Sequence, residues 1–344
     1  MSFKSWLNVV TLVLIALVLF LARHDIAQAF LMLGRVNVWV FLLVIPAQFL
    51  SYFAHGEIVF SYLRQRGDIE RVSHFEAAWV ALEFNFVNHV FPTGGMSGVS
   101  YMTWRLNKLG VSTGRATLAQ VVKFGMTFLA YAVLAVVALF AITADVGLNR
   151  YAILVTSGLI ILIILGIFGA MYLFSHRERL NRFERFIDRL LNRKIKRLLR
   201  RRKDIVNAEV ITSFFDDMCS DYRTLRERPK LLLWPFVWGL VFNVAEAALF
   251  FVTFLALGHV VNPAPILVAT GLAGLVGAFF VTPGGAGGYE AMMVVFLTSV
   301  GVSASVALAG VVLARTALIL IAIATGYITY HRAIKTYGKA PTAS

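Results

Sequence analysis

The chain has 344 residues, of which 59% are hydrophobic and only 15% are charged, and its mean hydropathy is +0.77. A soluble domain is nearer half apolar and a quarter charged, so this composition excludes an ordinary soluble protein and indicates a polytopic membrane protein. The apolar runs are continuous rather than alternating, which excludes a β-barrel, and the single cysteine, Cys219, excludes an intrachain disulfide and a cysteine metal cluster. We expect an all-α fold in which residues 1–344 form a single integral membrane domain.

The apolar segments predict about eight membrane helices, together with short re-entrant segments. The expected helices span about 5–23, 36–63, 74–91, 117–143, 151–174, 231–257, 264–281 and 303–330, with short segments at 95–106 and 288–300. Basic residues gather at 64–71, at 105–115 and in the tail after residue 330. Because short basic loops face the cytoplasm, we expect an inner-membrane protein with both termini cytoplasmic.

A basic segment separates the two groups of helices. Residues 177–203 contain 13 Lys or Arg and 3 Asp or Glu, out of a net charge of +14 for the whole chain. Apolar residues recur through it at helical spacing, which predicts a basic amphipathic helix on an anionic cytoplasmic leaflet, within a cytoplasmic segment at about 175–230. A nucleic-acid arm would not need the apolar stripe, whereas a simple determinant of topology would need only the charges. The residues expected at the lipid surface are Arg182, Arg185, Arg189 and Arg193.

One short sequence pattern occurs twice. Pro92 is followed by Gly94 and Gly95, and Pro283 is followed by Gly284 and Gly285. In each copy Gly-Val-Ser begins 18 residues after the proline, at 110 and at 301, so that the copies are offset by 191 residues. Pro and Gly break helices, and a break at membrane depth is tolerated only where the freed backbone groups find partners. Paired broken segments are typical of transporter sites, although two glycine-rich loops could also recur by chance.

The two copies are predicted to have opposite orientations. A shift of 191 residues places the helices at 36–63, 74–91 and 117–143 on those at 231–257, 264–281 and 303–330. The helix at 36–63 ends in a basic loop, whereas the helix at 231–257 begins after the basic segment. We therefore expect two inverted repeats, at about 36–143 and 227–334, which is an architecture of alternating access.

Charged residues within apolar segments are costly and mark a cavity or a pair. They are Glu57, Glu76, Glu83, Lys123, Glu246, Glu290 and Arg315, accompanied by Asn85, Asn88 and Asn243. We expect Glu57 and Glu76, near helix ends, to reach the membrane surface, and Asn243 and Glu246 to share one face of a helix. Lys123 and Arg315 each follow a break, and we expect Arg315 to pair with Glu290. A structural salt bridge and a substrate site are equally compatible with that pair.

No motif indicates an enzyme, a cofactor or a metal. There is no Walker loop, the histidines lack metal-ligand spacing, and no βαβ pattern surrounds the glycine-rich breaks. We therefore assign no catalytic residue and expect neither a cofactor nor a metal.

The second break carries a resemblance to a known family. Thr282-Pro-Gly-Gly-Ala-Gly-Gly-Tyr-Glu290, followed by Gly301-Val-Ser, Ala307 and Arg315, resembles the signature of the lysylphosphatidylglycerol synthase transmembrane-region family. Asn88 to Pro92 with Gly94 resembles that family's weaker first motif, but Thr93 to Met96 stand where the family commonly has an arginine and a glutamate. The resemblance covers nearly the whole chain and implies a lipid flippase without the aminoacyl-transferase domain, since the chain ends soon after the last helix.

The sequence and the resemblance together predict a protein that moves a phospholipid or another polar-headed lipid, anionic or amphiphilic, between leaflets. The residues expected to bind the substrate are Asn85, Asn88, Pro92, Gly94, Gly95, Lys123, Glu246, Pro283, Gly284, Gly285, Glu290 and Arg315. One alternative is a membrane transferase acting on lipid-linked sugars or amino-acylated lipids, with Glu83 or Glu246 as its base. Another is an accessory subunit that positions a lipid-modifying enzyme. Expected partners are anionic membrane lipids, such an enzyme or a second copy of the chain, but not nucleic acid.

Overall fold

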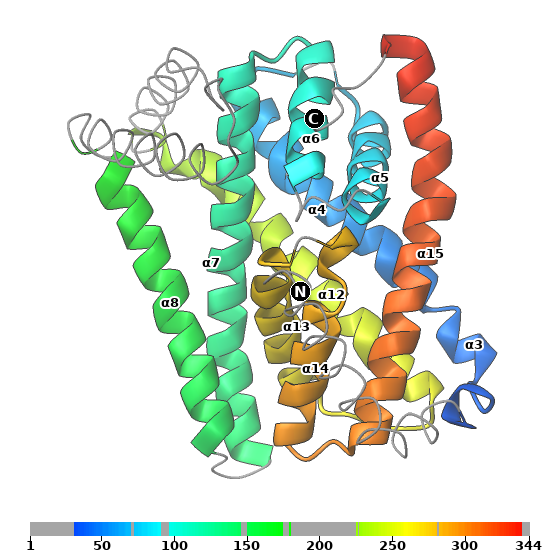
Figure 1. The fold of residues 1–344 in the computed structure, drawn as a ribbon. Helices are drawn as coiled ribbons and strands as arrows, with labels where there is room; N and C mark the ends of the chain where they lie inside the picture. The colour runs from blue at the N-terminus through cyan, green and yellow to red at the C-terminus, as the bar shows by residue number, and fades with distance from the viewer. Residues whose placement is uncertain are drawn as a thin grey trace, which may run out of the picture.

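A computed structural model of the protein describes residues 31–69, 72–90, 96–145, 150–174, 179, 225, 227–280 and 282–338, and these residues form helices and no strand (Figure 1). The expected all-α membrane fold is confirmed. The helices are α3 (Val38–Phe41), α4 (Val44–Arg66), α5 (His74–Val90), α6 (Met96–Lys108), α7 (Thr113–Asp145), α8 (Arg150–Phe174), η2 (Pro229–Leu232), α12 (Leu233–Ala256), α13 (Pro263–Ala278), η3 (Pro283–Gly285), α14 (Gly288–Ser299) and α15 (Ala304–Tyr337). The expected helix at 5–23, the basic segment at 177–203 with its four arginines, and the first break at Pro92 lie outside the described residues.

Five helical stretches of the described chain are long and apolar enough to cross a membrane. They are Val38–Arg66, Thr113–Thr143, Arg150–Gly169, Pro229–Ala256 and Ala304–Tyr337. Several boundaries differ from the expected ones; α7, for example, begins at Thr113 and not at residue 117. The helix expected from Val36 is divided into α3, which Asn37 caps through its side chain, and α4. The last helix continues to Tyr337, so the first basic residues expected in the tail belong to helix α15.

The remaining helices form two short hairpins at opposite ends of the molecule. Helices α5 and α6 have 17 and 13 residues, and α13 and α14 have 16 and 12, about half the length of α7 and α15. Figure 1 shows α5 and α6 in the upper half and α13 and α14 in the lower half, with their tips directed toward each other. We call the end of α5 and the start of α6 the first tip, and the segment between α13 and α14, which contains the second Pro-Gly break, the second tip.

The two halves run in opposite directions, as the charge pattern predicts. Helix α4 rises from the lower right of Figure 1, whereas α12 descends from the upper left. Helix α7 descends and α15 ascends. Adding 191 to the bounds of α4, α5, α6 and α7 gives those of α12, α13, α14 and α15 to within three residues.

Small residues allow the helices of the two halves to approach closely. Helix α4 packs along α12, α5 packs against α15, and α13 packs against α7. Gly326 of α15 is buried, and a Cβ there would overlap the Phe86 Cβ and lie 2.7 Å from the carbonyl oxygen of Leu82. Small residues are the usual means of close helix approach in membranes, where the hydrophobic effect does not drive association.

Gly326→Ala is therefore expected to destabilise the protein. The added methyl meets backbone and Cβ atoms that cannot rotate away, and overpacking of this kind costs about 1–3 kcal/mol. Thermal unfolding of the detergent-solubilised variant should show a lowered midpoint. Gly274→Ala is the matched control, because a Cβ at Gly274 meets nothing within 4 Å. Equal midpoints for the two variants would show that α5 and α15 are not in close contact.

Candidate functional site

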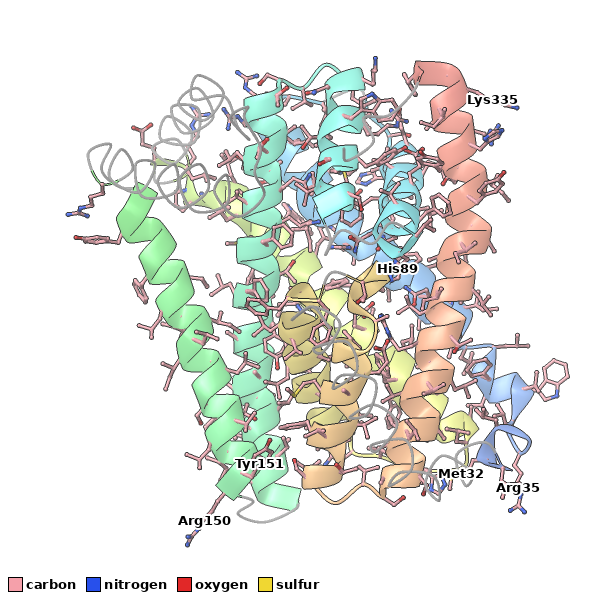
Figure 2. All side chains as sticks on the ribbon, in the orientation of Figure 1. Met32, Arg35, His89, Arg150, Tyr151 and Lys335 are labelled. Atoms are coloured by element: carbon pink, nitrogen blue, oxygen red, sulfur yellow. The ribbon has the colours of Figure 1, made fainter. Side chains whose placement is uncertain are left out.

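The two hairpin tips meet in the middle of the molecule. The end of α5 contacts η3, and Figure 2 shows His89 midway between the two ends of the molecule. The Nδ1 of His89 lies 2.8 Å from the carbonyl oxygen of Asn85, and a Cβ on Gly284 would come within 2.9 Å of the His89 ring. The second break is therefore covered by the end of the first hairpin.

Glycines allow the backbone conformation of the second tip. Gly284 has φ 58° and Gly285 has φ 71°, which is the left-handed region that glycine adopts without strain. Gly285 also packs against Gly277, since a Cβ added to Gly285 would lie 2.8 Å from the Gly277 carbonyl oxygen. The expected helix break at Pro283 is therefore present, and it leaves carbonyl groups that need partners at membrane depth.

Arg315 of α15 supplies one of these partners. Its Nη2 donates to the carbonyl oxygen of Gly284 at 2.8 Å, and its Nε donates to Glu290 Oε1 at 2.7 Å. The guanidinium carbon lies 4.3 Å from the centre of the Tyr289 ring. The expected ion pair of Glu290 and Arg315 is thus present, and it joins α14, α15 and the tip of the second hairpin.

Glu290 uses both carboxylate oxygens. While Oε1 accepts from Arg315, Oε2 accepts from the backbone N–H of Gly287 at 2.6 Å, which caps the first turn of α14. The Glu290 side chain is 22% exposed, whereas that of Arg315 is 7% exposed. The pair is therefore open on the side of the carboxylate.

Two helix N-termini are also directed at this region. The N-termini of α6 and α14 point to the middle of the molecule from opposite ends (Figure 1). Helix N-termini carry a partial positive charge and unpaired N–H groups, both of which favour anions. Together with Arg315, these ends form a setting suited to an anionic group.

Comparison of the sequence with known proteins identifies its family. The family model described as "Lysylphosphatidylglycerol synthase TM region" matches residues 6–326. The chain belongs to this family. It is also similar to a UPF0104 membrane protein of Methanothermobacter thermautotrophicus, with 23% identity over 232 residues that cover 67% of each chain.

Besides Glu290, the centre of this family member contains a second carboxylate, Glu246. It lies near the middle of α12 and accepts a hydrogen bond from the Ser51 hydroxyl of α4, at 2.5 Å. Asn243 instead donates to the carbonyl oxygen of Thr127 in α7, at 3.2 Å, and to that of Gly239. Asn243 and Glu246 lie three residues apart on α12, as expected for one helix face, and they bond to different neighbouring helices, α7 and α4.

Lys123, the cation of the first half, is enclosed by aromatic rings. Its side chain is fully buried, with Nζ 4.1 Å from the centre of the Phe84 ring and 4.8 Å from that of Phe124. Among the described residues no acceptor or carboxylate contacts Nζ. Lys123 is thus held by cation–π contacts and is covered in this arrangement.

The asparagines of α5 behave differently from each other. Asn85 is buried and its Nδ2 donates to the carbonyl oxygen of Ala81 in the same helix, so its amide is directed along α5. Asn88 is partly buried near Gly98 of α6, and its Oδ1 has no hydrogen-bond donor among the described residues. Only Asn88 therefore keeps a free polar atom near the first tip. Pro92, Gly94 and Gly95 stay predictions, since they lie outside the described residues.

Two buried ion pairs were not expected from the sequence. Glu57 is buried and contacts Arg64 at 2.6 Å and His74 at 3.1 Å, so the expectation that it reaches the membrane surface is wrong. Glu83 accepts from Arg105 Nε at 3.1 Å and from the Tyr101 hydroxyl at 2.9 Å, which joins α5 to α6. Both pairs stabilise the first half. Periodicity gives no signal for either, because the partners come from different turns and helices.

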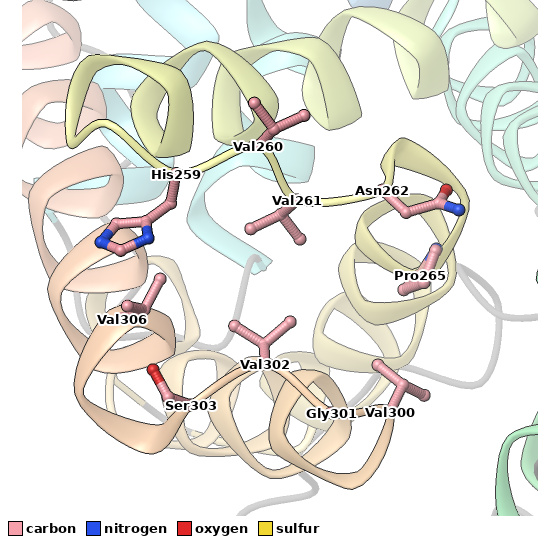
Figure 3. Close-up of a pocket in the computed structure, with 10 residues that line it drawn as sticks. All are labelled: His259, Val260, Val261, Asn262, Pro265, Val300, Gly301, Val302, Ser303 and Val306. Carbon is pink, nitrogen blue, oxygen red and sulfur yellow. The ribbon is translucent and has the colours of Figure 1, made fainter. Parts of the chain in front are cut away.

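A pocket of about 310 Å³ lies away from this centre (Figure 3). Its lining comes from the loop after α12 and the loop between α14 and α15, and includes His259, Asn262 and Ser303. The pocket is at the far end of α14 from Glu290, about 14 Å along the helix from Glu290 to Ser299. Its lining carries no charged side chain apart from the ionisable His259, so we do not assign it to the candidate site.

Proposed function

We propose that this protein moves a polar-headed, anionic lipid between the leaflets of a membrane, with the head group bound where the hairpin tips meet. The observation that carries the proposal is the position of Arg315. Its guanidinium is held at the second tip by Glu290 and the Gly284 carbonyl oxygen, and no described residue accepts from Nη1. An arginine is well suited to bind phosphate because its N–H groups match the geometry of two phosphate oxygens.

The two hairpins are further support. Each is too short to serve as two membrane helices, and we interpret both as re-entrant segments that enter from opposite faces. Broken helices near the midplane, with N-termini directed at an anionic group, are the arrangement found at transporter sites. The two halves also pack differently, since α7 lies close to α12 whereas α15 touches α4 much less. Exchange of these two packings would give a second arrangement open to the other side.

In the present arrangement a head group would reach Arg315 through Glu290. Glu290, Tyr289 and His89 are each partly exposed, while Arg315 is nearly covered. An entering phosphate would compete with Glu290 for the guanidinium and free its carboxylate. This explains how one pair can be structural in one state and bind substrate in another.

Of the two candidate bases for the enzyme alternative, Glu83 is the less suitable. Glu83 is buried, and its Oε2 accepts from both Arg105 and Tyr101, which makes it poorly accessible to a donor substrate. Glu246 remains available to that alternative, since Ser51 is its hydrogen-bond partner. An accessory role beside a lipid-modifying enzyme is the third hypothesis and makes no demand on Arg315.

Reconstitution separates these hypotheses. Purified protein in liposomes is supplied with fluorescent phosphatidylglycerol, phosphatidylethanolamine or phosphatidylcholine in the inner leaflet, and a membrane-impermeant quencher measures arrival in the outer leaflet. We expect head-group-dependent movement without chemical change, fastest for the anionic lipid. A covalent lipid product would favour the enzyme, and equal rates in protein-free liposomes would contradict the proposal.

The proposed cytoplasmic location of both termini has its own test. Val260 is 84% exposed in the loop between α12 and α13. In intact cells, Val260→Cys and Val146→Cys are expected to react with an impermeant maleimide from outside, while the native Cys219 should react only after lysis. Labelling of position 260 from the cytoplasm alone would show that the second half has the opposite orientation.

A further inference from the structure

The centre of the protein contains two carboxylates and one guanidinium. Arg315 pairs with Glu290 at 2.7 Å and lies over the Tyr289 ring. Glu246 lies one helical turn before Phe250, whose ring stacks on that of Tyr289, and its own hydrogen bond comes from the neutral hydroxyl of Ser51. With both carboxyls ionised this group carries a net charge of about −1, since ordinary carboxyls are deprotonated at neutral pH. An unbalanced charge at membrane depth costs a few kcal/mol or more, so a single bound proton would neutralise the group at low cost.

The surroundings supply no second cation to balance Glu246. The ionisable groups that face this centre are Tyr52 of α4, His89 of α5, Tyr131 of α7, Tyr289 and Glu290 of α14, and Arg315 of α15. Lys123 of α7 is enclosed by the rings of Phe84 and Phe124. Among the groups that face the centre Arg315 is the permanent cation, and it already pairs with Glu290.

Glu246 is a partly exposed residue, as are Tyr289 and Glu290, while Ser51 and Arg315 are buried. A carboxyl that binds and releases protons needs such access. Its partner Ser51 suits either form, because a hydroxyl can donate to a carboxylate and accept from a carboxylic acid.

We propose that Glu246 is a proton-binding site, and that Glu246, Glu290 and Arg315 together exchange protons with the anion that Arg315 binds. In the present arrangement Glu246 carries one proton while Arg315 pairs with Glu290. When an anionic head group takes Arg315, Glu290 loses its cation and binds a second proton from water, which keeps the group neutral. The coupling of proton and anion rests on the proposed lipid transport, whereas the assignment of a proton to Glu246 does not depend on it. The coupling identifies the proton as the ion that accompanies the lipid.

The proton on Glu246 is tested by infrared difference spectroscopy of the purified full-length protein at neutral pH. We expect the absorption of a protonated carboxyl in the natural protein, its loss in Glu246→Gln, and its retention in the surface control Glu76→Gln. It should also be lost in Glu290→Gln, because Arg315 is then free to pair with an ionised Glu246. If the absorption persists in Glu246→Gln, the assignment to Glu246 is overturned. If it persists in Glu290→Gln, the sharing of one proton between the two carboxyls is overturned.

Ser51→Ala keeps the assignment testable if Glu246→Gln does not fold. Loss of the Ser51 hydroxyl should shift the carboxyl absorption, and an unshifted band would place the proton on another residue. For the coupling, dispersed short-chain phosphatidylglycerol is added to the natural protein in weakly buffered solution with a pH dye. We expect proton uptake that phosphatidylcholine does not cause, and no uptake overturns the coupling. If liposome assays show no lipid movement while the infrared result holds, the proposed function fails and the proton site stands.

Discussion

Arg315→Gln is expected to reduce the rate of lipid movement per folded molecule by about 10- to 150-fold, while most of the folded yield is retained. The estimate follows from the loss of a hydrogen bond to a charged group, worth about 1.5–3 kcal/mol. Glu290 keeps its bond from the Gly287 N–H in this variant, so α14 remains capped. Arg315→Lys should retain part of the rate, because an ammonium makes one contact with a phosphate where a guanidinium makes two.

The charge exchange Glu290→Arg with Arg315→Glu distinguishes a binding site from a structural pair. A purely structural pair should recover folded yield and rate together when the charges are exchanged. A head-group site should not recover the rate, because the cation then lies on α14 instead of α15. Liposome assays normalised to folded protein give both quantities. A variant without either charge that transports at the natural rate would exclude the pair from the mechanism.

Glu83→Gln is expected to have the opposite effect, with a large loss of stability and little change in rate per folded molecule. The substitution leaves Arg105 buried without its closest carboxylate, and breaking a buried pair costs about 3–5 kcal/mol. Among the described residues, Arg105 then keeps Glu76, at 3.7 Å, and the ring of Tyr337. Thermal unfolding of the detergent-solubilised protein measures the loss.

Glu76→Gln is the matched control for Glu83→Gln. Glu76 lies on the same helix and faces the same arginine, but its side chain is 36% exposed, so its loss should change the unfolding midpoint little. A specific transport rate that falls with Glu83→Gln as strongly as with Arg315→Gln would place Glu83 in the mechanism and not in the framework of the first hairpin.

The fold was largely predictable because its signals are local. Apolar runs predict helices, prolines and glycines predict the breaks, and the loop charges predict opposite directions for the two halves. The 191-residue offset between Pro92 and Pro283 also predicts the offset between α7 and α15. The helix ends were less accurate, since Lys335 continues α15 beyond the apolar stretch through backbone hydrogen bonds that hydropathy does not report.

The site was predictable only where sequence spacing constrains contacts. Glu290 and Arg315 follow the same break on consecutive helices, and their pairing was expected. Glu57 was interpreted wrongly, because Arg64 lies two turns later on the same helix and His74 comes from the next one. The positions of His89 beside Gly284 and Ser51 beside Glu246 join separate halves of the chain, and no local pattern encodes such contacts.

The two contacts of the Glu290 carboxylate connect the backbone of one helix to a charged side chain of another. One oxygen holds the backbone at the start of α14 and the other holds a side chain of α15, so a change in the electrical balance at Arg315 acts directly on where α14 begins. Aspartate, one methylene shorter, cannot span both contacts. When Arg315 is drawn away, Glu290 keeps its bond from the Gly287 N–H, but the start of α14 is no longer tied to α15, next to glycines that already have left-handed backbone angles. A change of charge is thereby converted into a change in how α14 is held to α15, at the point where the two halves of the molecule touch.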